Sequence, residues 1–78
     1  MPRFYFHLHR NEMSLEDDDG MELPDLSAAQ KEAHQSAMEL FIDAVRFHGH
    51  VENQHFEVQD NLGNIVFTLP FQDIVKFR

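Results

Sequence analysis

The chain has 78 residues, no cysteine and a formal net charge of −8, which predicts one small domain (residues 1–78) without disulfides or thiolate metal sites. So short a chain is only marginally stable, and self-association is the stabilising device that remains open to it. Seven carboxylates fall within residues 12–25, a stretch that holds no Lys or Arg. Because phosphate binding depends on Lys and Arg, this charge distribution argues against nucleic acid as a partner.

The location of the protein is predicted from apolar runs. Residues 1–10 contain no long apolar run of the kind found in secretory signals, and no stretch approaches the roughly 20 apolar residues that span a bilayer. The sequence therefore predicts a cytoplasmic protein that has no membrane partner.

The first expected element is a strand over residues 3–9. Apolar and polar side chains alternate there with period two, which is typical of a strand with one face in the core. The predicted core face carries Phe4, Phe6 and Leu8, and the other face carries Tyr5, His7 and His9. A turn at residues 10–12 and a short return strand at 13–15 are expected next, and the acidic run 16–20 is expected to end that pairing.

A long helix is predicted from Leu26 to about Phe47. Asp25 or Ser27 is the expected N-cap, and Gly49 stands where a left-handed C-cap is expected. At 100° per residue one stripe is mostly alanine, which allows close contact with a sheet. That stripe consists of Leu26, Ala29, Ala33, Ala37, Leu40 and Ala44. A second apolar group lies to one side and is the predicted interface between copies of the chain: Met38, Phe41, Ile42 and Val45.

Two further strands are expected around a turn at residues 60–63. A four-residue loop with Gly63 in the αL conformation would pair Val58 with Ile65 and Phe56 with Phe67. This register would place five side chains on the core face: Phe56, Val58, Ile65, Phe67 and Leu69. A helical turn is expected over the apolar tail of Phe71, Ile74, Val75 and Phe77. The predicted fold is α+β, one long helix packed on a small antiparallel sheet in the order β(β)αββ with a short C-terminal tail.

Three motifs along the chain resemble a known family: PRFYFHL at residues 2–8, DxxGxELPD at 17–25, and FEVxDxxGxxxxTxPF at 56–71. In this order they are similar to a family of short alphaproteobacterial proteins catalogued as a domain of unknown function. The resemblance covers nearly the whole chain. It implies the same α+β layout and a bacterial, cytoplasmic setting, and it implies no activity or catalytic residue.

Six histidines are the main candidates for a chemical role. His7 and His9 share one strand face, while His48 and His50 flank the glycine at the helix end. Such pairs suit zinc, but no cysteine helps them and no third or fourth ligand can be placed. We therefore expect no tight metal site and no cofactor, with these four histidines as the only candidate ligands.

Enzymatic chemistry finds no support in the sequence. There is no cysteine nucleophile and no glycine-flanked serine elbow, and three glycines are too few for a phosphate-cradling loop. An EF-hand is excluded because its first and last ligand positions, counted from Gly20, would be Leu15 and Leu26. The prediction is a protein without enzymatic activity and without catalytic residues.

The leading functional hypothesis is a small, non-enzymatic binding or regulatory module that associates with itself. The first alternative is an antitoxin-like protein that neutralises a basic protein partner. Its acidic partner surface would be Glu16, Asp17, Asp18, Asp19 and Glu22. The second alternative is a histidine-based metal binder.

Overall fold

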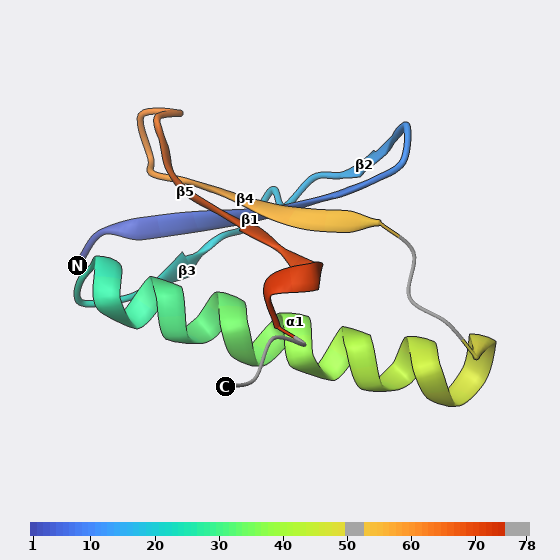
Figure 1. The fold of residues 1–78 in the computed structure, drawn as a ribbon. Helices are drawn as coiled ribbons and strands as arrows, with labels where there is room; N and C mark the ends of the chain where they lie inside the picture. The colour runs from blue at the N-terminus through green and yellow to red at the C-terminus, as the bar shows by residue number, and fades with distance from the viewer. Residues whose placement is uncertain (50–52, 75–78) are drawn as a thin grey trace.

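The computed structural model describes residues 1–49 and 53–74 and shows one long helix below an antiparallel sheet of five strands (Figure 1). In chain order the elements are β1 (Arg3–Arg10), β2 (Met13–Leu15), β3 (Met21–Glu22), α1 (Leu26–His48), β4 (Gln54–Gln59), β5 (Ile65–Pro70) and the 3-10 turn η1 (Phe71–Asp73). The predicted α+β class, the return strand at 13–15 and the strand–helix order are confirmed. The strand β3 is an addition that the sequence analysis missed.

The sheet is arranged around β1, in the order β2-β1-β4-β5. Both short strands pair antiparallel with β1, β2 near its C-terminal end and β3 near its N-terminal end. β4 pairs with β1 over six positions, from Tyr5 opposite Gln59 to Arg10 opposite Gln54. The first strand of the chain is therefore the centre of the fold, with segments from both halves of the chain beside it.

Helix α1 has the predicted caps. The Asp25 carboxylate accepts a hydrogen bond from the Ala28 backbone N–H at 2.9 Å, so Asp25, not Ser27, is the N-cap. Gly49 has φ 78°, and its N–H donates to the carbonyl of Val45.

The contact between helix and sheet is built on alanine. Ala29, Ala33 and Ala37 are fully buried, as predicted, and Leu40 packs against the edge of the core. Leu26, expected in the same stripe, is 40% exposed, so the buried stripe does not extend into the first turn of the helix. Small side chains let the backbone of α1 approach the sheet closely, which the larger residues on its other side would prevent.

The C-terminal tail contributes to the core. The predicted helical turn is the 3-10 turn η1, which follows β5 directly. Phe71 is 2% exposed, and its ring packs 5.5 Å from that of Phe56, while Ile74 is also buried. Val75 and Phe77, the rest of the predicted tail, lie outside the described residues.

The register of the β4–β5 hairpin differs from the prediction. Phe67 lies opposite Val58 and Leu69 lies opposite Phe56, with a bulge at the step where Ile65 pairs with Gln59. The predicted Val58–Ile65 and Phe56–Phe67 pairs are therefore wrong. Ile65 is 58% exposed instead of buried, and Val66, which is not among the residues predicted for the core face, packs against the core.

The turn explains this register. The Asp60 backbone N–H donates to the carbonyl of Asn64, which closes a loop one residue shorter than the predicted one. In a regular ladder this loop would carry the large residues of β5 to the wrong face. The bulge inserts one residue and returns Phe67 and Leu69 to the core side.

The turn between β2 and β3 needs glycine at position 20. Gly20 has φ 71°, in the left-handed region that glycine adopts without strain. A Cβ at this position would lie 2.8 Å from the Tyr5 ring and 3.0 Å from the carbonyl oxygen of Phe4. Gly63 also has a positive φ, but a Cβ there would meet nothing within 4 Å.

These two glycines give a matched test. Gly63→Ala should lower the free energy of unfolding by about 1–2 kcal/mol, the cost of a left-handed conformation. Gly20→Ala should cost an additional ~1–3 kcal/mol, because its methyl group also overpacks the turn against β1. Urea denaturation of both variants measures the difference. Equal losses would show that β1 and the turn separate freely enough to admit the methyl group.

Candidate functional site

The face of the sheet that points away from α1 carries the protein's polar chemistry. On β1 this face holds His7 and His9, as the alternation predicted, and the pairing brings His55 opposite His9 and Glu57 opposite His7. The alternation of residues 54–59 already places His55 and Glu57 together on one face of their strand. The sequence analysis missed them as partners of His9 because nothing local shows that β4 lies beside β1.

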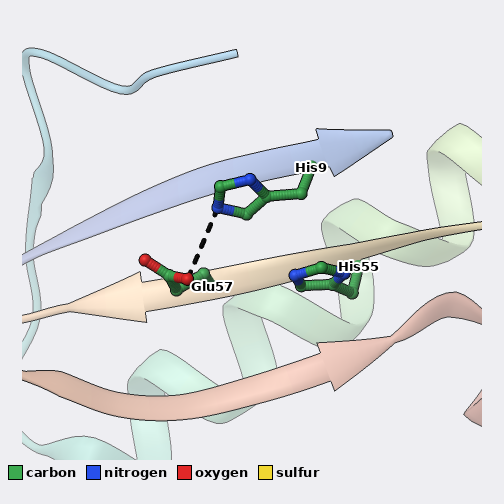
Figure 2. A group of neighbouring side chains, drawn as sticks. All are labelled: His9, His55 and Glu57. Atoms are coloured by element: carbon green, nitrogen blue, oxygen red, sulfur yellow. Dashed lines mark ion pairs between the residues drawn. The ribbon is translucent and has the colours of Figure 1, made fainter. Parts of the chain in front are cut away.

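Three of these side chains, His9, His55 and Glu57, form a cluster (Figure 2). Each offers one ligand atom, and these atoms lie within 4.8 Å of one another. The Nε2 atom of His9 is 3.5 Å from the Glu57 Oε1 atom, and the two imidazole rings stack with centroids 4.9 Å apart. All three residues are partly buried, so the cluster is reachable from solvent yet shielded by its neighbours.

Neighbouring side chains orient two members of this cluster. The Ser14 hydroxyl on β2 lies 2.9 Å from His9 Nδ1, and the Gln59 amide donates to Glu57 Oε2 at 2.8 Å. The other ring nitrogen of His9, Nε2, is buried and has no hydrogen-bond partner among the described residues. Its 3.5 Å contact with Glu57 is an ion pair only when the ring is protonated, and a buried polar atom without a hydrogen bond calls for a physical explanation.

His7 faces the acidic loop instead of His9. Its buried ring accepts a hydrogen bond at Nδ1 from the Asp17 backbone N–H, and the same atom lies 3.9 Å from a Glu16 carboxylate oxygen. The structure therefore does not bring together the two strand histidines named in the sequence analysis. The side chain of His48 and the whole of His50 lie outside the described part of the chain.

Asp17 organises the acidic loop from within. One carboxylate oxygen accepts from the Phe6 N–H of β1, and the other accepts from the N–H groups of Asp19 and Gly20. Partial burial raises the pKa of the Asp17 carboxyl, but these three hydrogen bonds and the nearby His7 outweigh burial and hold the pKa below its usual value. Asp17 thus fastens the loop to the edge of β1 away from β4, between the residues of β1 that pair with β3 and those that pair with β2.

The remaining acidic residues divide into two groups. Glu22 forms an ion pair with Arg3 at 3.2 Å, and the same guanidinium donates to the backbone carbonyl of Asp19 at 2.8 Å. The side chains of Glu16, Asp18 and Asp19 are exposed. Of the five carboxylates in the expected acidic partner surface, Asp17 and Glu22 are therefore engaged by hydrogen bonds or an ion pair within the fold, and Glu16 has a longer contact with His7.

The predicted interface residues lie on the outer side of α1. Met38, Ile42 and Val45 are 38%, 46% and 48% exposed, and Phe41 is partly buried. Phe47, near the end of the helix, is 70% exposed. The C-terminal half of α1 thus presents several large apolar side chains to solvent.

A small pocket shows where the sheet stops covering this half of the helix. It has a volume of about 150 Å3, and its lining residues come from β1, α1 and β4: Arg10, Leu40, Asp43, Ala44, Phe47 and Gln54. Two of these lining residues are joined, because the buried Gln54 accepts a hydrogen bond from Arg10.

Comparison with known proteins identifies the family. The sequence profile of the domain of unknown function DUF6894 matches residues 3–72, so the chain belongs to that family. No curated protein and no solved structure matches the chain. Within the described residues, no helix has the length and apolar character required to cross a bilayer.

The role of Asp17 predicts a difference between two neighbouring acidic residues. In wild type both carboxylate oxygens of Asp17 accept backbone N–H groups. Asp17→Asn replaces one of these oxygens with an NH2 group, which is itself a donor, so at least one backbone N–H is left without an acceptor. It should lower the free energy of unfolding by about 1–3 kcal/mol. Asp18→Asn, on an exposed side chain, should change it by no more than about 0.5 kcal/mol. Denaturant titration of both variants checks this, and equal effects would show that Asp17 does not anchor the loop.

The same bonds predict a pH dependence. Because the folded-state pKa of Asp17 lies below the unfolded value, its contribution to stability is present above that unfolded value and is lost as pH falls through the folded pKa. The difference in stability between wild type and Asp17→Asn should therefore shrink on acidification below the usual carboxyl range. Unfolding curves at a series of pH values measure this, and a difference that stays constant into strong acid would contradict it.

Proposed function

We propose that this member of the DUF6894 family is a non-enzymatic binding module that assembles as a twofold dimer through the outer side of α1. The observation that carries the proposal is the apolar patch formed by Met38, Phe41, Ile42 and Val45, which the protein's own sheet leaves largely uncovered. A contiguous exposed patch of this kind usually marks a contact surface.

The position of the patch on the helix explains why one chain leaves it uncovered. At 3.6 residues per turn, Met38, Ile42 and Val45 lie about 120° to 180° around the axis from the buried Ala33. The sheet packs on the alanine side and cannot reach them. The apolar residues in the described part of the C-terminal tail, Phe71 and Ile74, are buried in the core and not on this patch.

The charges beside the patch favour a second copy as its partner. Glu39 and Arg46 lie on the same flank of α1, and neither belongs to an ion pair among the described residues. In an antiparallel helix pair the same flanks meet. A twofold axis next to Ile42 therefore sets Glu39 of each copy near Arg46 of the other, which forms two equivalent ion pairs around the apolar contact.

Stability supports the same assembly. A cysteine-free chain of 78 residues has a small core, and the helix contributes mainly alanine to it. Burying four larger side chains between two copies adds apolar contact and stabilises the folded state by mass action. The alternative of a basic partner on the acidic loop has less support, because Asp17 and Glu22 are already engaged within the fold.

The dimer can be tested by comparing two variants, one that introduces a negative charge within the patch and one that introduces the same charge outside it. Sedimentation equilibrium at high micromolar concentration should show a dimer for wild type and a monomer for Ile42→Glu, because dimerisation would bury two unpaired carboxylates. Gln30→Glu adds the same charge at an exposed site in the N-terminal half of α1 and should leave the dimer intact. A monomeric wild type, or an unchanged Ile42→Glu dimer, would refute the proposal.

The orientation of the two helices has its own test. Glu39→Arg and Arg46→Glu should each weaken dimerisation by placing like charges together, and the double variant should restore much of the loss. A double-mutant cycle on the dimer dissociation constant measures this coupling. Additive losses would show that the helices meet in another arrangement.

A further inference from the structure

We propose that His9, His55 and Glu57 form a binding site for one divalent transition-metal ion on the open face of the sheet, with Zn2+ as a ligand it accepts. The sequence alone argued against zinc because no third ligand could be placed. The pairing of β1 with β4 supplies that ligand, since it sets two imidazoles and a carboxylate side by side. The two strands are far apart in the chain, with the facing residues Arg10 and Gln54 separated by 44 positions.

The distances fit such a site after a small adjustment. Ligand atoms 2.0–2.1 Å from a tetrahedral zinc ion lie about 3.3 Å apart. His9 Nε2 and Glu57 Oε1 are already 3.5 Å apart. The widest separation in the cluster, 4.8 Å at most, has to close by about 1.5 Å. The His55 ring, which stacks on that of His9, would have to rotate to make this closure (Figure 2).

Hydrogen bonds around the cluster hold the ligands in the form a metal requires. When His9 donates from Nδ1 to the Ser14 hydroxyl, its Nε2 atom carries the lone pair that faces Glu57. Metal-binding histidines regularly donate their other ring N–H in this way, and metal-binding carboxylates are themselves hydrogen-bonded. Here the Gln59 side-chain amide donates such a hydrogen bond to the Glu57 carboxylate.

The Nε2 atom of His9, which makes no hydrogen bond within the described residues, is the second observation that points to a ligand. This atom is buried, lacks a hydrogen-bond partner within the described residues, and is directed into the cluster. A bound cation would satisfy this lone pair and the Glu57 carboxylate together, which removes the cost of leaving a buried polar atom unpaired.

The ligand types select among cations. Imidazole nitrogen suits zinc and its transition-metal neighbours, whereas Mg2+ and Ca2+ prefer sites made only of oxygen. Two nitrogens and one carboxylate oxygen leave room for water as a fourth ligand, as in open zinc sites. The site lies on the face of the sheet opposite α1, so it remains accessible in the proposed dimer and does not depend on it.

Calorimetric titration of the untagged protein at neutral pH tests the site, with Zn2+ and Mg2+ as the two probes. One Zn2+ per chain should bind with measurable heat, and Mg2+ should not compete, which separates a specific site from general attraction to an acidic protein. His55→Ala and Glu57→Gln each remove a ligand and should weaken Zn2+ binding by at least about 100-fold, the upper end of the loss typical for an outer partner of a ligand. Ser14→Ala, which touches no metal, should weaken it to a smaller extent by releasing the His9 ring.

His34→Ala is the matched control, because His34 is exposed on α1 and its ring nitrogen contacts only the carbonyl of Gln30 in its own helix. This variant should bind Zn2+ as wild type does. Glu57→Gln preserves the size of the side chain, and an unchanged circular dichroism spectrum shows that the variant is folded. Absence of Zn2+ binding in wild type, or equal binding by wild type and folded Glu57→Gln, would overturn the proposal.

Discussion

The pairing of β1 with β4 is the constraint on which both faces of the protein depend. On one face it sets Phe6 beside Val58 and Leu8 beside Phe56, and these side chains form the apolar surface on which α1 packs. On the other face it sets His9 beside His55, with Glu57 next along the strand. Because side chains alternate with period two, a slip of one residue would exchange these faces, burying the imidazoles and exposing the phenylalanines. The apolar core thus enforces the register that brings the histidines together.

The acidic character of the chain has a structural use that its net charge alone does not suggest. Asp17 and Asp60 each begin a DxxG segment, and each carboxylate accepts backbone N–H groups of its own turn, while the glycine three residues later has a positive φ. Backbone hydrogen bonds lower the pKa of both carboxyls, led at Asp60 by the bond from Asn64 and opposed at Asp17 by partial burial. Asp17 and Asp60 therefore each hold a turn together. Because Asp17 is used in this way, only part of the acidic run at residues 16–20 is left to face solvent.

The two sides of helix α1 differ in the size of their apolar side chains. Its inner side is alanine because the sheet lies close, and this restricts how much apolar surface the helix can bury within one chain. Its outer side carries Met38, Ile42 and Val45, whose burial requires another surface. In the proposed dimer the helix is thus the element that links the fold of one chain to the contact with a second chain, while the histidine cluster lies on the opposite side of the sheet.

The sequence by itself determined what depends on near neighbours. The caps at Asp25 and Gly49, the alanine stripe and the alternation of β1 all follow from local geometry, and the structure contains them. The tertiary structure alone decided the bulge that exposes Ile65, the two-residue strand β3 and the meeting of His9 with His55 and Glu57. A bulge is chosen by which side chains the core accepts, and β3 is too short to have a periodicity of its own. The histidine cluster exists only because two strands from opposite ends of the chain pair, and such pairing is a property of the whole fold.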